Sequence, residues 1–83
     1  MAERQRFTLY SREYCHLCRD MLVTLSPLRS EFGFDLEVID IDTDPELEHR
    51  FNELVPLLVH GEAELARWRL DAAALRAYLA EIG

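Results

Sequence analysis

Hydrophobic residues change their spacing along the chain, and each change predicts a new element of structure. Over residues 6–11, Phe7 and Leu9 alternate with Thr8 and Tyr10, which is the two-residue period of a strand. Over residues 16–32 the apolar positions recur every three or four residues, which predicts a helix with one buried face. That face consists of Leu17, Met21, Leu25, Leu28 and Phe32.

The end and the interior of this helix carry further signals. Gly33 stands where a left-handed C-terminal cap is expected. Pro27 lies inside the helix, where it removes a backbone hydrogen bond and clashes with the preceding turn. We therefore expect either a kink at Pro27 or a break at which Ser26 caps a new turn.

A second strand is predicted over residues 35–41, and a second helix follows it. Leu36 and Val38 face one side of that strand and Ile39 and Ile41 the other, as expected of a central strand covered on both faces. The next helix begins at Asp44, which acts as its cap and is followed by a proline in the first turn. Its buried stripe is formed by Leu47, Phe51 and Leu54.

The last third of the chain predicts a hairpin and a final helix. Strands over residues 57–60 and 63–69 are joined by a tight turn at Gly61. Asp71 caps the last helix, whose apolar face holds Leu75, Tyr78, Leu79 and Ile82. The order β-α-β-α-β-β-α predicts one α/β domain over residues 1–83, with a right-handed first crossover and a mixed four-stranded sheet flanked by helices.

Composition and charge argue against nucleic-acid binding, membrane insertion and secretion. The chain has 83 residues and a net charge of −7, which argues against nucleic acid as a partner. It has no apolar run of transmembrane length, and the polar stretch over residues 1–6 has no apolar core of a secretory signal. We therefore expect a cytoplasmic protein that does not bind membranes. In that compartment a close cysteine pair indicates redox chemistry or metal binding.

The candidate chemistry lies in Cys15-His16-Leu17-Cys18, at the junction of the first strand and the first helix. Residues three apart share a helix face, so the two sulfurs can reach bonding distance. Unpaired backbone N–H groups and the positive end of the helix dipole favour thiolate over thiol. Such a site lowers a cysteine pKa from about 8.5 to about 3.5–7.5. Cys15 is therefore predicted to be the nucleophile, and the more buried Cys18 the resolving thiol.

Two basic residues flank the pair. Arg12 precedes Cys15 by three residues, and His16 adds positive charge beside the sulfur when it is protonated. The alternative for both is a solvated surface side chain, because exposed charge pairs contribute under about 1 kcal/mol.

Zinc is the main alternative chemistry for the cysteine pair. A structural zinc site needs four protein ligands, and the sequence offers no second C-x-x-C and no H-x₃₋₅-H pair. His49 and His60 are single, one on a helix and one near a turn. We expect no metal site.

A C-x-x-C after a strand, opening a helix in a β-α-β unit, is the thioredoxin-like signature, and here the chain resembles glutaredoxin, in particular the short bacterial glutaredoxin-like proteins. Residues 9–18 resemble the active-site strand and loop, residues 34–44 the second strand with its acidic exit, and residues 54–61 the segment that carries the family's cis-proline. The resemblance implies a cis Val55–Pro56 bond near the cysteines. It also implies that the Val55 backbone hydrogen-bonds a bound peptide or glutathione. A plain strand-start proline is the alternative.

Two segments differ from glutaredoxin. His16-Leu17 replaces the family's Pro-Tyr between the cysteines, and Trp68-Arg69-Leu70-Asp71 replaces its Gly-Gly turn and acidic residue. The resemblance therefore supports the redox centre better than it supports glutathione binding. Tyr14 is the better aromatic candidate for a substrate groove, whereas Trp68 is expected to pack at the sheet edge or under the last helix.

The sequence thus predicts a dithiol oxidoreductase that reduces disulfides in proteins or small molecules. Catalysis is assigned to Cys15 and Cys18, and substrate binding to the residues around them, which are Arg12, Tyr14, His16, Val55 and Pro56. We expect a monomer with no cofactor beyond its own thiols. Glutathione is a candidate co-substrate, and glutathione or a thioredoxin-reductase-like enzyme is the candidate electron donor. The alternatives are a non-catalytic binding module of the same fold, and metal or iron–sulfur handling by the two thiolates.

Overall fold

The elements follow each other in the predicted order, with one added turn. The computed structural model describes residues 5–82, so most of the polar N-terminal stretch lies outside the described residues. The elements are β1 (Arg6–Ser11), α1 (His16–Phe32), β2 (Asp35–Asp40), a 3-10 turn η1 (Ile41–Thr43), α2 (Pro45–Phe51), β3 (Leu57–His60), β4 (Ala63–Arg67) and α3 (Ala72–Ile82).

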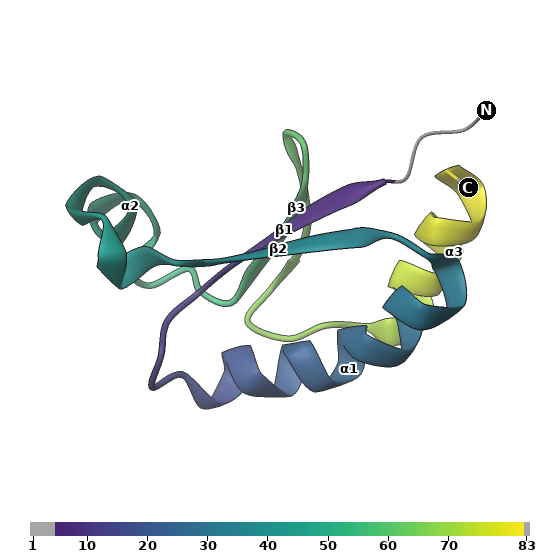
Figure 1. The fold of residues 1–83 in the computed structure, drawn as a ribbon, viewed down its shortest axis with the longest axis horizontal. Coiled ribbons are helices and arrows are strands. Elements are labelled where there is room, and N and C mark those ends of the chain that lie inside the picture. Colours follow the sequence, from purple (N-terminus) through teal and green to yellow (C-terminus); the bar gives the residue numbers. More distant parts are fainter. Residues whose placement is uncertain (1–4, 83) are drawn as a thin grey trace.

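The four strands form one mixed sheet in the order β2-β1-β3-β4. β1 and β2 are parallel, and the β1–β3 and β3–β4 pairs are antiparallel. Figure 1 shows α1 below the sheet, with α2 and α3 at opposite ends of the molecule. This is the thioredoxin-like architecture that the sequence predicts.

Each central strand supplies residues to two separate cores, because successive side chains point to opposite faces. Phe7 and Leu9 of β1 pack with Leu58 of β3 against α1 and α3. On the other face, Leu57 packs in a smaller cluster with Phe51 of α2, with Tyr10 beside them. The predicted alternation in the first strand is therefore confirmed.

The helix α1 runs without interruption from His16 to Phe32 with Pro27 inside it, so of the two alternatives for Pro27 the break at Ser26 is wrong. Gly33 has φ 73°, and its N–H donates to the Arg29 carbonyl over 2.8 Å, which confirms the left-handed cap. The buried face is formed by Cys18, Met21, Leu25 and Leu28. Leu17, predicted to belong to it, is instead partly exposed.

The second strand is not central. β2 is an edge strand that pairs only with β1, and Val38 is 46% exposed. Apolar residues on both faces of a strand do not reveal its neighbours, because strand order depends on contacts between distant segments. β2 also ends one residue earlier than predicted, since Ile41 begins η1, and β4 ends at Arg67, two residues short of the prediction.

The caps of the two later helices agree with their predicted residues. The Asp44 side chain accepts the Glu46 N–H over 2.9 Å, and the Asp71 side chain accepts the Ala74 N–H over 3.1 Å. Among residues 5–82, no helix combines the length and the hydropathy that crossing a bilayer requires.

Candidate functional site

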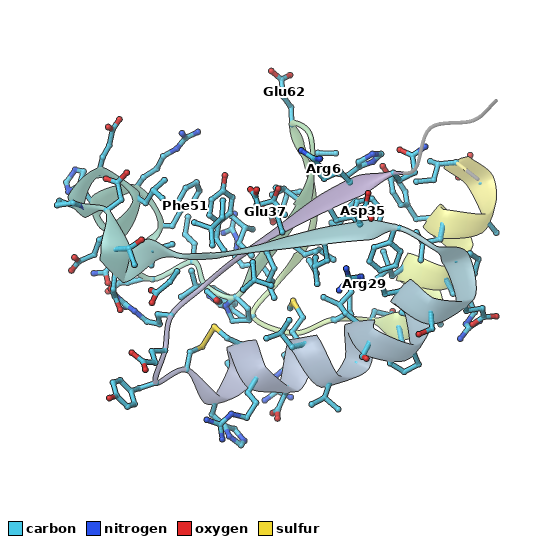
Figure 2. The ribbon with its side chains drawn as sticks, in the orientation of Figure 1. Arg6, Arg29, Asp35, Glu37, Phe51 and Glu62 are labelled. Atoms are coloured by element: carbon cyan, nitrogen blue, oxygen red, sulfur yellow. A yellow bond between two sulfur atoms is a disulfide. The ribbon has the colours of Figure 1, made fainter. Side chains whose placement is uncertain are left out.

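The two cysteines form a disulfide at the start of α1, drawn as the yellow bond in Figure 2. Their Cα atoms lie 5.2 Å apart. Cys15 has extended backbone angles and is the N-cap of α1, and its sulfur accepts the Cys18 N–H over 3.1 Å. Cys15 is partly exposed, whereas Cys18 is only 3% exposed. This geometry agrees with an accessible first sulfur and a buried second one.

A cavity of about 250 Å³ lies beside the disulfide. Both cysteines line it, with Ser11 from the end of β1 and Asp40 from the end of β2. The two parallel strands end here in register, because Ser11 pairs with Asp40. Arg12, Glu13, Arg19 and Leu22 complete the lining.

Arg12 lines this cavity, but its guanidinium group is bound to other side chains. Its Nε and Nη2 donate to the two carboxylate oxygens of Asp42 over 3.2 and 2.5 Å. Its Nη1 donates to the side-chain oxygen of Asn52 over 2.9 Å and to the Asn52 carbonyl over 3.2 Å. Arg12 thus joins the loop before Cys15 to η1 and to the end of α2. No pattern in the sequence indicated these partners.

The Arg12–Asp42 pair changes the titration of both groups. The hydrogen bond from Arg12 holds the pKa of the Asp42 carboxyl below its usual value of 3.8. The same bond raises the pKa of Arg12. Much of the positive charge predicted beside Cys15 is therefore balanced by a carboxylate.

His16 and Tyr14 lie next to the cysteines and are both exposed. The His16 Nε2 lies 3.4 Å from an Asp20 carboxylate oxygen, one turn along α1. Tyr14 is 96% exposed, so no groove of the protein encloses its ring. Their places agree with the prediction that they border the cysteines, and their roles stay predictions.

Trp68 lies next to the site and is not part of the core. It is 49% exposed, and its φ of 66° places it in the left-handed region. Its backbone N–H donates to the Pro56 carbonyl over 2.8 Å, and its indole N–H donates to the Glu53 carbonyl over 2.9 Å. Trp68 was expected at the sheet edge or under the last helix; it directly follows the edge strand β4, and about half of its side chain is exposed. In the sequence, this position was marked only by the resemblance to glutaredoxin, in which a Gly-Gly turn and an acidic residue stand where this chain has residues 68–71.

The Val55–Pro56 peptide bond is cis, and Pro56 is fully buried ahead of β3. Val55 packs at the margin of the smaller core. Neither residue lines the cavity beside the disulfide. The Pro56 carbonyl accepts the backbone N–H of Trp68, which lines a cavity together with His16.

A second cavity, of about 360 Å³, lies between the first turns of α1 and the segment that follows β4. His16, Leu17 and Asp20 form one wall, and Trp68, Arg69 and Leu70 form the other. Because His16 and Leu17 lie between the two cysteines, this cavity begins at the C-x-x-C segment itself.

No group of three or more His, Cys, Asp or Glu side chains that could hold a metal comes together within residues 5–82. His60 hydrogen-bonds to Tyr78 and Gln5, and His49 is exposed on α2.

A profile of the glutaredoxin-like domain (DUF836) matches residues 6–80 of the sequence. The chain belongs to this glutaredoxin-like family. An uncharacterised protein of Mycobacterium tuberculosis is 32% identical over 82 residues, which cover 93% of this chain and 84% of that protein.

Solved structures agree with this family. Protein Ne2328 of Nitrosomonas europaea is 38% identical, covers 94% of both chains and superposes with a TM-score of 0.76. An X. campestris protein solved by X-ray crystallography is 33% identical, with a TM-score of 0.73 over 90% of this chain and 96% of that one. Thioredoxin 1 of Thermosipho africanus shares the fold, with a TM-score of 0.62 at 21% identity over 93% and 97% of the two chains. The glutaredoxin-like chain therefore has a thioredoxin fold with a C-x-x-C pair at disulfide distance.

Proposed function

We propose that this protein is a thiol–disulfide oxidoreductase that reduces disulfides through Cys15 and Cys18. The observation that carries the proposal is the position of Cys15, which is the N-cap of α1 with its sulfur on the Cys18 N–H at 3.1 Å. In the reduced protein the same N–H and the positive end of the helix dipole would favour the thiolate. Partial exposure leaves that sulfur open to attack a substrate.

The first step joins enzyme and substrate. The Cys15 thiolate attacks one sulfur of a substrate disulfide, and a new bond forms between the two sulfurs as the substrate S–S bond breaks. The departing substrate sulfur leaves as a thiolate and takes up a proton from water. The product is a mixed disulfide in which Cys18, 3% exposed, lies one turn inside the helix beneath the new bond.

The second step releases the product. The Cys18 thiol gives up its proton, and its sulfur attacks the Cys15 sulfur, which forms the Cys15–Cys18 disulfide and expels the second substrate thiolate. Two electrons pass from the protein dithiol to the substrate disulfide. A thiol or dithiol donor, either glutathione or a thioredoxin-reductase-like enzyme, returns them. The reaction needs no further cofactor, and a reducing cytoplasm would supply such donors.

The neighbouring residues have supporting roles in this proposal. The Val55 backbone, which precedes cis-Pro56, would hold an extended substrate segment as an added strand. Tyr14 and His16 border the attacking sulfur. Through its bonds to Asp42 and Asn52, Arg12 positions the loop that carries this sulfur. One chain supplies all of these groups, so a monomer suffices.

Trapping of the intermediate tests the proposal. The Cys18→Ser variant, mixed with a disulfide-bonded peptide, should accumulate a mixed disulfide that mass spectrometry detects on Cys15. The Cys15→Ser variant is the matched control and should accumulate none, because Cys18 is buried. If both variants form the adduct equally, or neither does, the proposed roles are wrong. A protein that binds the peptide equally well with both cysteines replaced, and has no exchange activity, would be a binding module instead.

A further inference from the structure

We propose that the cavity between Trp68 and α1 binds a polypeptide segment of the substrate, with a bulky apolar side chain on Trp68 and an acidic residue on Arg69. The inference rests on the proposed function and specifies its substrate class. It assigns a specificity role to two residues that the C-x-x-C chemistry does not use.

The position of the cavity relates it to the disulfide. Its α1 wall includes His16 and Leu17, the two residues between the cysteines. Its volume of about 360 Å³ is in the range of cavities that enclose a ligand. A chain segment that runs from a disulfide held at Cys15 past His16 and Leu17 would enter this cavity.

The indole of Trp68 is held in place before any ligand binds. A tryptophan with φ 66° is in a conformation that bulky residues rarely adopt. Two hydrogen bonds hold it there, from its backbone N–H to Pro56 and from its indole N–H to Glu53. Strained residues retained by their surroundings cluster at ligand-binding sites. In the conformation that these two hydrogen bonds hold, about half of a large aromatic side chain is exposed.

The chemistry of the cavity favours one kind of occupant. Leu17 and Leu70 supply apolar surface on opposite walls, and Trp68 adds an aromatic face. Arg69 is exposed beside them, and its guanidinium has no ion-pair partner among the ion pairs found within residues 5–82. On the opposite wall the Asp20 carboxylate already faces His16. A ligand with a bulky apolar side chain next to an acidic group therefore complements the wall formed by Trp68 and Arg69. This local positive charge contrasts with the net negative charge of the whole chain.

The test separates binding from exchange. In the Cys15→Ser/Cys18→Ser variant no disulfide chemistry occurs, and Trp68 is the chain's only tryptophan, so its fluorescence reports occupancy of the cavity. The probes are two short peptides with an S-methylated cysteine next to Phe, identical except for Asp or Lys after the Phe. The Asp peptide should shift the Trp68 emission to shorter wavelength and bind about fivefold more tightly than the Lys peptide.

Charge reversal and side-chain removal sharpen the result. Arg69→Glu should reverse the preference between the peptides, whereas Arg76→Glu, the same charge change at the Glu31 ion pair, should leave it unchanged. In the protein with both cysteines, the substrate is a disulfide of the Asp peptide made with an unmethylated cysteine. Trp68→Gly suits the positive φ and should raise the KM for this disulfide about tenfold more than that for hydroxyethyl disulfide. Trp68→Phe should recover part of this loss.

The outcomes also separate this inference from the proposed function. Peptide binding that shifts Trp68 in a protein without any exchange activity would support the groove and refute the oxidoreductase. Exchange activity with no Trp68 shift, or with a preference that Arg69→Glu does not reverse, would overturn the groove and leave the oxidoreductase standing. A Trp68 shift with glutathione but with neither peptide would overturn the assigned substrate class.

Discussion

The two ends of α1 differ in which residues occupy the helix cap and the nearby backbone position with left-handed φ. At the C-terminal end, Gly33 takes φ 73° and its N–H donates to Arg29, so a residue without a side chain occupies the left-handed position. At the N-terminal end, the nearby left-handed position belongs to Trp68, with φ 66°. The cap of that end is Cys15, although Ser, Thr, Asp and Asn are the usual N-caps.

This difference indicates that the C-terminal half of α1 serves the stability of the fold and that its N-terminal end serves the site. Around the C-terminal half, residue choice agrees with local preference, and Leu25 and Leu28 are buried. Around the N-terminal end, local preference is broken, and Tyr14, Leu17 and Trp68 remain exposed. Residues that oppose local preference persist where a site requires them. We therefore expect substitutions at the two ends of α1 to affect different measurements.

Replacement of the attacking sulfur should have the largest effect. Cys15→Ser keeps an N-cap oxygen for the Cys18 N–H but removes the thiolate, so the rate of disulfide reduction should fall at least about a thousandfold. The free energy of unfolding, compared with that of the reduced wild type, should change by less than about 1 kcal/mol because serine is a good N-cap. Turnover and urea unfolding measure the two quantities. Retained activity would show that Cys15 is not the nucleophile, and a large loss of stability would show that its roles as cap and nucleophile are not separable.

Truncation in the buried half of the helix should do the opposite. Leu25 is 0% exposed, so Leu25→Ala should lower the free energy of unfolding by about 2–5 kcal/mol. Val23, on the same helix but 69% exposed, is the matched control, and Val23→Ala should cost under about 0.5 kcal/mol. Urea denaturation measures both. If reduced Cys15 is alkylated at an altered rate in the folded Leu25→Ala variant, the two ends of α1 do not act independently and the comparison is wrong.

The left-handed cap of α1 should contribute a smaller amount. A Cβ at Gly33 would meet no atom within 4 Å, so Gly33→Ala tests backbone strain alone and should cost about 1 kcal/mol. Gly33→Asn should cost less, because asparagine tolerates the left-handed region. Equal losses for the two variants in urea denaturation would mean that φ is not the cause.

The smallest effect should come from the ion pair beside the site. Because the hydrogen bond from Arg12 lowers the pKa of Asp42 in the folded protein, the unfolded chain binds more protons in acid. The stabilising contribution is present above the ordinary carboxyl pKa of 3.8 and is lost as the pH falls through the lowered folded value. Wild type should therefore lose stability on acidification more steeply than Asp42→Asn. Urea midpoints across a pH series check this, and parallel curves would contradict it.

Local signals in the sequence predicted much of this fold. The alternation in β1, the period of α1, the Gly33 cap and the caps at Asp44 and Asp71 depend on neighbours within one turn or strand. The place of Cys15 at the start of α1 follows from the same local signals. These predictions are confirmed because short-range spacing alone determines them.

The features that sequence reasoning missed involve contacts between distant segments. The edge position of β2 depends on which strands pair, and Arg12 finds its partners at Asp42 and Asn52, 30 and 40 residues away. The place of Trp68 depends on the carbonyls of Glu53 and Pro56. No periodicity or local propensity encodes such contacts, so the cysteine pair could be predicted and the contacts of Arg12 and Trp68 around it could not.

The most direct test of the central claim is the alkylation rate of reduced Cys15 as a function of pH, measured with iodoacetamide in the Cys18→Ala variant, whose backbone keeps the N–H that caps the sulfur. If the start of α1 stabilises the thiolate, the rate should rise with a midpoint below about 7.5, against about 8.5 for a free cysteine. A midpoint at about 8.5 or above would contradict the account.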